Sequence, residues 1–270
     1  MSLRTASIAP HFPDASAFMF RVCFSAPLME TGQSMAQTHS VHADYSLADV
    51  RIFVGLSDAA LERIKRHCVL HRYQPGASVV GYLESSSDVF FIVSGEVRVA
   101  IYSLSGKVVS FRELGPGEIF GEYPAIDGGP RSASVEARTS SLIASMSSTA
   151  FIDVLETEPK VSQALLPSLV TRIRALTTRV YEFSTLAVNN RIQAELLRLT
   201  TIAGTQGNSA RITPSPTHAD IAAHVSTSRE AVSRELARLS RIGIIERESH
   251  ALLVKDVTRL VDMVHEATGE

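Results

Sequence analysis

Short apolar runs separated by glycine turns fill the chain from residue 69 to residue 147. The runs are rich in valine, isoleucine and phenylalanine, and they begin at Val79, Val89, Val97, Val108 and Leu142. Glycine lies between most of them. Short β-branched and aromatic runs with turn residues between them are typical of antiparallel strands. The pattern therefore predicts a small all-β roll or barrel in this part of the chain.

A helical pattern precedes the predicted strands. From Leu47 onward apolar residues recur at helical spacing, and Ser57 is placed to start a short amphipathic helix that contains Leu61 and Ile64. We therefore expect a helical entry into the roll.

Residues 1–45 show no sustained period and carry prolines among small and polar residues. We expect a disordered N-terminal extension. Met29 and Met35 lie inside it, so a later start that leaves residues 1–34 out of the native protein stays open. A targeting peptide is the weaker alternative, because no cleavable apolar core is evident.

The apolar pattern changes to a helical period after Pro159. Residues at alternating spacings of three and four form a seam of Leu166, Leu169, Ile173, Leu176, Val180, Phe183 and Ala187. Such a seam is typical of a coiled coil, so it predicts a dimerisation helix and a homodimer. A helix packed on its own domain is the alternative. Pro167 must start or kink this helix, and we expect one continuous helix from about Pro167 to Asn189.

Residues 190–270 carry the pattern of two short helices joined by a tight turn. An amphipathic helix begins near Ile192, and residues 203–216, rich in Gly, Ser, Thr and Pro, are interpreted as a linker. Residues 217–220 read Thr-His-Ala-Asp, a capping-box start. A second helix, beginning near Ser228, is predicted to bury Val232, Leu236 and Leu239. Two apolar runs, 244–245 and 252–254, predict a hairpin wing.

The outer face of that second helix is basic, although the chain is not. The helix presents Arg229, Arg234, Arg238 and Arg241 against only Glu230 and Glu235. The formal net charge of the whole chain is −2, and such a whole-chain value does not reveal a basic face on one helix. A local basic face of this kind is the electrostatic feature that a nucleic-acid partner would require.

Composition excludes several classes of protein. The 270 residues are 45% hydrophobic and 20% charged, which suits two ordinary small domains. The two cysteines form no C-x-x-C pair, so neither a disulfide framework nor a thiolate metal cluster is expected. No apolar run approaches the roughly 18 residues of a membrane helix. We expect a soluble cytoplasmic protein without metal or membrane partner. No nucleophile elbow, zinc-protease helix or P-loop is present, so we do not expect an enzyme.

Residues 120–135 read F-G-E-Y-P-A-I-D-G-G-P-R-S-A-S-V and carry the clearest site chemistry. Arg131 can bind two phosphate oxygens at once, and Ser132 can add a hydroxyl or a backbone N–H. Glu122 can only accept hydrogen bonds, which suits a sugar hydroxyl. The glycines allow close approach of the backbone, and Pro124 suits the first turn of a short helix that favours an anion. Phosphate and ribose together indicate a nucleotide.

This stretch resembles the phosphate-binding cassette of cyclic-nucleotide-binding domains. The resemblance implies that Glu122 binds the ribose 2′-hydroxyl, that Arg131 pairs with the cyclic phosphate, and that Ser132 helps to hold it, with Gly121 and Ala133 beside them. We expect Arg131 to have no structural role without the ligand, so that Arg131→Leu would leave the fold undisturbed.

The C-terminal pattern resembles the winged helix-turn-helix of the cyclic AMP receptor family, within the Crp/Fnr regulators. Residues 229–234 read R-E-A-V-S-R, which matches the R-E-x-V-x-R of that family's recognition helix. Ser226 stands where the family usually has a turn glycine, at a cost of about 1 kcal/mol for a left-handed residue. Ala231 is also smaller than the residue often found there.

The two resemblances together imply an α+β chain with four regions. They are a disordered extension over 1–45, a cyclic-nucleotide-binding β-roll over 46–158, a dimerisation helix over 159–189 and a winged helix-turn-helix over 190–270. The implied protein is a homodimeric, cyclic-nucleotide-responsive transcription regulator that binds a palindromic TGTGA-like site and contacts RNA polymerase. The DNA-binding residues would be Thr217, Ser228, Arg229, Glu230, Ser233 and Arg234.

The base of the nucleotide is less well specified. In the family a Thr-Ser pair on the dimer helix reads the adenine amino group, and alignment places Leu176 and Thr177 at those positions, with Thr178 beside them. Cyclic AMP is the expected effector, and the missing threonine leaves cyclic GMP open.

Two other functions stay open on the residues. Relatives of this family respond to oxygen through iron–sulfur clusters or to carbon monoxide through haem, and His67, Cys68 and His71 near the first strand could supply haem ligands. The cysteine count disfavours a cluster. A cyclic-nucleotide hydrolase is the remaining alternative, although ligand binding accounts for the only close acid–base pair.

Overall fold

The structure is a computed structural model that describes residues 39–40, 45–102 and 108–268. Most of the predicted disordered extension lies outside the described residues. Within it, His39–Ser40 form strand β1, which pairs with His71 and Arg72. The prediction of disorder was therefore wrong at these two residues, because the backbone there finds hydrogen-bond partners on a strand edge.

Eight further strands form the predicted β-roll, in which two antiparallel sheets enclose the apolar side chains. One sheet has the order β1-β2-β9-β4-β7 and the other the order β3-β8-β5-β6. Ile92 of β4 is buried between the two sheets, whereas its neighbour Phe91 is buried on the opposite face of its sheet against Phe53 and Phe151. Burial on both faces explains the continuous apolar run of that strand. The strands are β2 (Cys68–Tyr73), β3 (Ser78–Val80), β4 (Val89–Ser94), β5 (Val97–Tyr102), β6 (Val108–Leu114), β7 (Ile119–Phe120), β8 (Ser134–Ala137) and β9 (Ser141–Met146).

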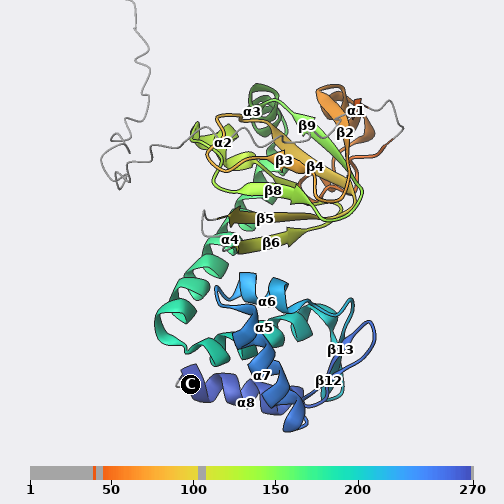
Figure 1. Cartoon of the computed structure of the whole chain (residues 1–270). Helices are drawn as coiled ribbons and strands as arrows, with labels where there is room; N and C mark the ends of the chain where they lie inside the picture. Colours follow the sequence, from red (N-terminus) through yellow and green to blue (C-terminus); the bar gives the residue numbers. More distant parts are fainter. Residues whose placement is uncertain (1–38, 41–44, 103–107, 269–270) are drawn as a thin grey trace, which may run out of the picture. The chain divides into compact units, whose positions relative to one another are not determined.

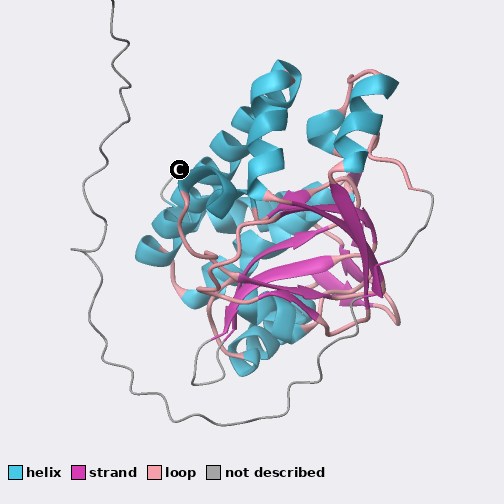
Figure 2. Cartoon of the chain, turned by 90° about the horizontal axis from the view of Figure 1, so that it is seen from above, coloured by secondary structure: helices cyan, strands magenta, loops and turns pink. Residues whose placement is uncertain are grey.

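Short helices close the roll (Figure 1). Helix α1 (Asp58–Arg66) begins at Ser57, whose hydroxyl accepts from the Ala60 amide as the sequence predicts. The others are η2 (Arg51–Phe53), α2 (Glu122–Asp127) and α3 (Ser148–Thr157). Figure 2 shows the strands of the roll gathered together, with helices at their margin.

The long helix differs from its prediction at both ends. Helix α4 spans Pro159–Thr185, so Pro167 lies inside it, and Pro159 occupies the first position, where a missing N–H costs nothing. It does not continue to Asn189. Leu186 leaves the helical conformation and buries its side chain, and a new helix, α5 (Val188–Ala203), follows.

The C-terminal domain is a helix-turn-helix with a four-stranded sheet of order β10-β11-β13-β12. The predicted linker was wrong, because Ala210 and Ile212 alternate into the core and pair with β13. The predicted hairpin wing is confirmed. The elements are β10 (Thr205–Gln206), β11 (Ser209–Ile212), α6 (His218–His224), α7 (Arg229–Arg241), β12 (Ile245–Arg247), β13 (Leu252–Val254) and α8 (Val257–Thr268). Among the described helices, none has the length and apolar composition needed to cross a membrane.

Candidate functional site

The turn between β7 and α2 brings backbone and side chains of the predicted cassette close together. Gly121 caps α2 with φ +79°, a left-handed conformation that favours glycine. A Cβ at this position would lie 2.7 Å from Arg131 Nη1 and 2.9 Å from the Asp88 carbonyl oxygen. Gly121 therefore both permits the turn and leaves room for the arginine.

Arg131 is buried although it carries a charge, since only 2% of the residue is exposed. Its Nε donates to Ser86 Oγ at 3.0 Å, its Nη1 donates to the Gly121 carbonyl at 3.0 Å, and its guanidinium lies over the Phe90 ring at 5.4 Å. Nη2 is buried and has no hydrogen-bond partner among the described residues. A buried guanidinium with one free donor is a site for an anion.

These contacts correct the expectation that Arg131 has no structural role. Burial lowers the pKa of Arg131, and the charges of Glu84 and Asp88 partly oppose that shift. The backbone amide of Arg131 also donates to the Glu84 carbonyl at 2.9 Å. Because the side chain joins three parts of the roll, its removal will also affect stability.

Glu122, the first residue of α2, is also 2% exposed. It forms an ion pair with Nη1 of Arg172, which reaches it from α4. Burial lowers the pKa of Arg172 to about 10, the charge of Arg112 adds to this effect and that of Glu118 opposes it, so the guanidinium stays charged at neutral pH.

Arg172 is a site residue that the sequence reasoning missed. It lies on α4 directly before Ile173, a residue of the apolar seam. A charged residue beside such a seam was the feature of the sequence that could have identified it. The side chain is 12% exposed, which is low for an arginine on a helix with a largely exposed surface.

The remaining predicted ligand residues lie in two places. Ser132 is exposed at the surface, and Ala133 is buried next to it. Thr177 and Thr178 are exposed on α4, and the Thr177 hydroxyl donates to the Ile173 carbonyl of its own helix at 2.9 Å. The structure thus brings Gly121, Glu122 and Arg131 together within one chain, whereas the two threonines face outward.

Two of the three side chains considered for a haem make other contacts, and the third, His67, is exposed. Cys68 donates through Sγ to the Ile64 carbonyl, and burial raises its pKa to about 12, so it is a protonated thiol. His71 Nε2 lies 3.0 Å from Ser145 Oγ. Within the described ranges no group of three or more His, Cys, Asp or Glu side chains is placed to hold a metal ion.

The six predicted DNA-binding residues are all exposed on the helix-turn-helix. Thr217 caps α6 by accepting from the Asp220 amide at 3.1 Å, and Ser228 caps α7 by accepting from the Ala231 amide at 3.2 Å. Ser226 in the turn has φ +50°. This is the left-handed conformation expected at a position where the family usually has glycine.

The basic face of α7 is narrower than predicted. Glu235 is 6% exposed rather than on the surface, and it accepts from Gln193 Nε2 at 2.7 Å and from Arg238 Nη2 at 2.7 Å. Arg238 is thereby tied to the domain core. The exposed cations of α7 are Arg229, Arg234 and Arg241.

Comparison with known families finds one match for the β-roll and another for the helix-turn-helix. Residues 70–158 match the family described as "Cyclic nucleotide-binding domain", and residues 190–263 match "Crp-like helix-turn-helix domain". The chain belongs to the Crp/Fnr family of transcription regulators. It is 29% identical over 218 residues to the CRP-like cAMP-activated global transcriptional regulator of Mycobacterium tuberculosis, covering 80% of this chain and 97% of the relative.

Solved structures share the fold. A CooA mutant from Carboxydothermus hydrogenoformans aligns with a TM-score of 0.69 at 21% identity, over 82% of this chain and 97% of that one. The c-di-GMP responsive regulator CLP of Xanthomonas campestris aligns with a TM-score of 0.63 at 20% identity, over 73% and 99%. At these identities the likeness concerns the fold, and effectors differ among proteins that share it.

Proposed function

We propose that this Crp/Fnr regulator is a homodimer that binds a palindromic, TGTGA-like DNA site in response to a cyclic nucleotide, with cyclic AMP as the effector. The observation that carries the proposal is the buried Arg131, whose Nη2 has no hydrogen-bond partner among the described residues, close to the buried carboxylate of Glu122. The relative from Mycobacterium tuberculosis is described as cAMP-activated, which supports this choice of effector.

The residues present fit the chemistry of a cyclic nucleotide. Arg131 Nη2 can donate to a phosphate oxygen, and Ser132, exposed beside it, can donate a second hydrogen bond. Glu122 can accept from a ribose hydroxyl, provided that its ion pair with Arg172 loosens or is shared. Nucleotide binding would therefore rearrange a contact between the roll and α4.

The surface of α4 supports the proposed homodimer. Its first turns pack on the roll through Val161 and Leu165. In these turns α4 behaves as a helix packed on its own domain, which was the alternative to a coiled coil. Beyond them, six large apolar residues are between 46% and 65% exposed: Leu166, Val170, Ile173, Leu176, Val180 and Tyr181. A second copy of α4 would cover this stripe, and Thr177 and Thr178 lie on the same helix, where a nucleotide base could meet the dimer seam.

DNA recognition would use the exposed start of α7. Arg229 and Arg234 can pair with guanine, and Glu230 can accept from cytosine, as major-groove readout by a recognition helix requires. The proposal assigns residues 46–158 to effector binding, α4 to dimerisation and 190–270 to DNA binding. A regulator of this type would act in the cytoplasm and contact RNA polymerase.

Calorimetric titration of cyclic AMP and cyclic GMP into the purified protein tests the effector. We expect saturable binding of cyclic AMP at one site per chain and weaker binding of cyclic GMP. Tighter binding of cyclic GMP would reverse the assignment of the base. Absence of binding by both would contradict the nucleotide site and direct attention to another effector, while the family's DNA-binding role would remain.

A further inference from the structure

Three basic side chains from three elements of the C-terminal domain lie together at its surface. His218 is the first residue of α6, Arg229 is the first residue of α7, and Arg247 is the last residue of β12. Arg247 Nη1 lies 3.4 Å from His218 Nε2, and the charge of Arg229 acts on the His218 ring. Arg229 and Arg247 are exposed, and His218 is half-buried. We call these three residues the basic cluster.

The alternation of side chains along β12 directs Arg247 toward the helices. Arg247 shares one face of the strand with Ile245, which is buried in the core of the domain. Glu246 lies between them on the other face, where it pairs with Lys255 at 3.1 Å. The carboxylate of β12 is therefore separated from the arginine that follows it.

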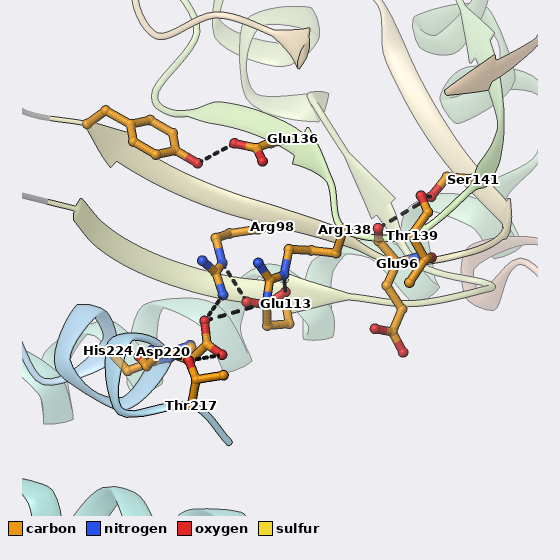
Figure 3. A network of polar contacts seen from close by, with 11 residues as sticks. Glu96, Arg98, Glu113, Glu136, Arg138, Thr139, Ser141, Thr217, Asp220 and His224 are labelled. Carbon is orange, nitrogen blue, oxygen red and sulfur yellow. Dashed lines mark hydrogen bonds and ion pairs between the residues drawn. The ribbon is translucent and has the colours of Figure 1, made fainter. Parts of the chain in front are cut away.

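The other carboxylates that are near the cluster in sequence also pair with residues outside it. Asp220 of α6 pairs with Arg98 and Arg138 of the β-roll (Figure 3). Glu248, which follows β12, pairs with Arg211. Among the residues that the structure describes, no carboxylate forms an ion pair with a member of the basic cluster.

Glu230 follows Arg229 in α7 without neutralising the cluster. Its carboxylate accepts hydrogen bonds from the Ser228 hydroxyl and from its own backbone amide. The basic cluster therefore leaves a local positive charge on the face that carries the proposed DNA-reading residues. Such a charge attracts an anion.

The contact between Arg247 and His218 determines the protonation state of the imidazole in protein without DNA. A guanidinium can only donate hydrogen bonds, so Nε2 of His218 accepts here and carries no proton. Burial lowers the pKa of His218, and the charges of Arg247 and Arg229 lower it further. His218 is therefore neutral at neutral pH.

A DNA phosphate beside the cluster would reverse this preference. A duplex carries about one negative charge per 1.7 Å of its axis, and phosphate oxygens accept hydrogen bonds from cations. One phosphate can accept from Arg247 and, once Nε2 is protonated, from His218 as well. The negative charge would also offset the repulsion between the two arginines and a charged imidazole.

We propose that the basic cluster binds a backbone phosphate of double-stranded DNA, and that His218 takes up a proton when this contact forms. The proposal rests on DNA binding by the Crp-like helix-turn-helix and does not depend on the effector. Proton uptake means that the pKa of His218 is higher in the complex than in the protein alone. The gain in affinity is therefore fully present below the lower pKa and is lost as the pH rises through the higher one.

DNA affinity at two pH values tests the proton uptake. The proteins compared are wild type, His218→Gln, Arg247→Gln and the control His67→Gln, which replaces an exposed histidine of the roll domain. A fluorescent duplex is selected from random sequence with wild-type protein, and its affinity is measured at about pH 6 and about pH 8. Cyclic AMP is added to all samples if it tightens wild-type binding, so that the comparison holds for either outcome with the effector.

Wild type is expected to bind about tenfold more tightly at the lower pH, which corresponds to a pKa difference of about one unit. His218→Gln should reduce this ratio to less than about twofold, with most of its loss at the lower pH, and His67→Gln should keep the wild-type ratio. A wild-type ratio in His218→Gln would overturn the proton uptake. Equal loss at both pH values, or a wild-type affinity that does not change with pH, would overturn it as well.

The salt dependence of binding tests the phosphate contact separately. Arg247→Gln should weaken binding and make the slope of log affinity against log salt shallower by about one per chain, because one fewer phosphate is neutralised. An unchanged slope would show that Arg247 does not contact a phosphate.

Calorimetry of duplex binding in buffers of different ionisation enthalpy counts the protons directly. At about pH 7 wild type should take up a fraction of a proton per chain, His67→Gln should take up the same amount, and His218→Gln should take up less. A single neutral methylphosphonate at the contacted position of the duplex should remove the same uptake. If no position of the duplex has this effect, the proton is not taken up toward a phosphate, and the proposal fails.

Discussion

Arg172 of α4 forms an ion pair with Glu122, the carboxylate proposed to bind the ribose of a cyclic nucleotide. The two side chains are 12% and 2% exposed. Either charge left alone in this environment would be costly, because removing one partner of a buried ion pair leaves the other unpaired. The pair therefore links the stability of the roll to the position of the long helix.

The variant Arg172→Leu is expected to lower the free energy of unfolding by about 3 to 5 kcal/mol, since Glu122 would remain buried without its partner. The double variant Arg172→Leu/Glu122→Gln should recover part of this loss, because the unpaired charge is then gone. Urea denaturation of wild type, both single variants and the double variant measures this coupling. Strictly additive losses would show that the two side chains do not interact.

Replacement of Arg131 should affect binding more than stability. Arg131→Gln is expected to weaken cyclic AMP binding by about 2 to 5 kcal/mol and to lower the free energy of unfolding by about 1 to 3 kcal/mol, since Ser86 and the Gly121 carbonyl lose a donor. Calorimetry and denaturation measure the two effects. Arg63→Gln, at an exposed arginine of the same domain, is the control. Wild-type affinity in Arg131→Gln would refute the proposed phosphate site.

Gly121 and Gly128 have the same backbone conformation, so variants at these two positions can distinguish backbone strain from crowding of the Arg131 side chain. Gly121 and Gly128 have φ +79° and +72°, but a Cβ at Gly121 meets Arg131 Nη1, whereas at Gly128 nothing lies within 4 Å. Both alanine variants should lose about 1 to 2 kcal/mol of stability from the left-handed backbone. Only Gly121→Ala should also weaken nucleotide binding, measured by calorimetry. Equal binding losses would mean that crowding of the arginine is irrelevant.

The homodimer can be tested on the exposed stripe of α4. Ile173 is 62% exposed, so Ile173→Glu should not disturb the folded chain, but it would place a charge in the proposed seam. We expect this variant to sediment as a monomer at concentrations where wild type is a dimer. Ala175→Glu, about 200° away around the helix, is the control and should remain dimeric. A dimeric Ile173→Glu variant would place the interface elsewhere.

Base reading by Arg234 predicts a change in sequence preference. Arg234→Ala should cost about 1 to 3 kcal/mol in DNA binding and relax the preference at one base pair of each half-site. Binding selection with cyclic AMP present provides the measurement. Arg241→Ala, at the last residue of the same helix, is the control and should keep the wild-type motif. If Arg234→Ala weakens all sequences equally, the arginine contacts phosphate only.

Some features were determined by residues close to one another in the sequence. The caps at Ser57, Thr217 and Ser228 each depend on a hydroxyl and an amide three residues later, so a short stretch of chain is sufficient to predict them. The strands of the roll follow from short apolar runs with turns between them. Glu122 begins one short helix and Arg131 follows its end, so a single motif was sufficient to predict the candidate site.

Other features depended on packing between distant elements. Arg172 contacts Glu122, and Arg98 contacts Asp220, only because α4 and α6 lie against the roll. The charge beside the apolar seam marks Arg172 in the sequence, but no periodicity or motif identifies the partner of either arginine. The short strands β10 and β11 look like a linker in the sequence, and they become strands because β11 pairs with β13 and β10 pairs with β11. The long helix ends at Thr185 because Leu186 gains burial outside it. Local sequence determined which elements form and how they begin, whereas the ion pairs and breaks between elements were decided by tertiary burial, since the free energy of a buried contact depends on both partners.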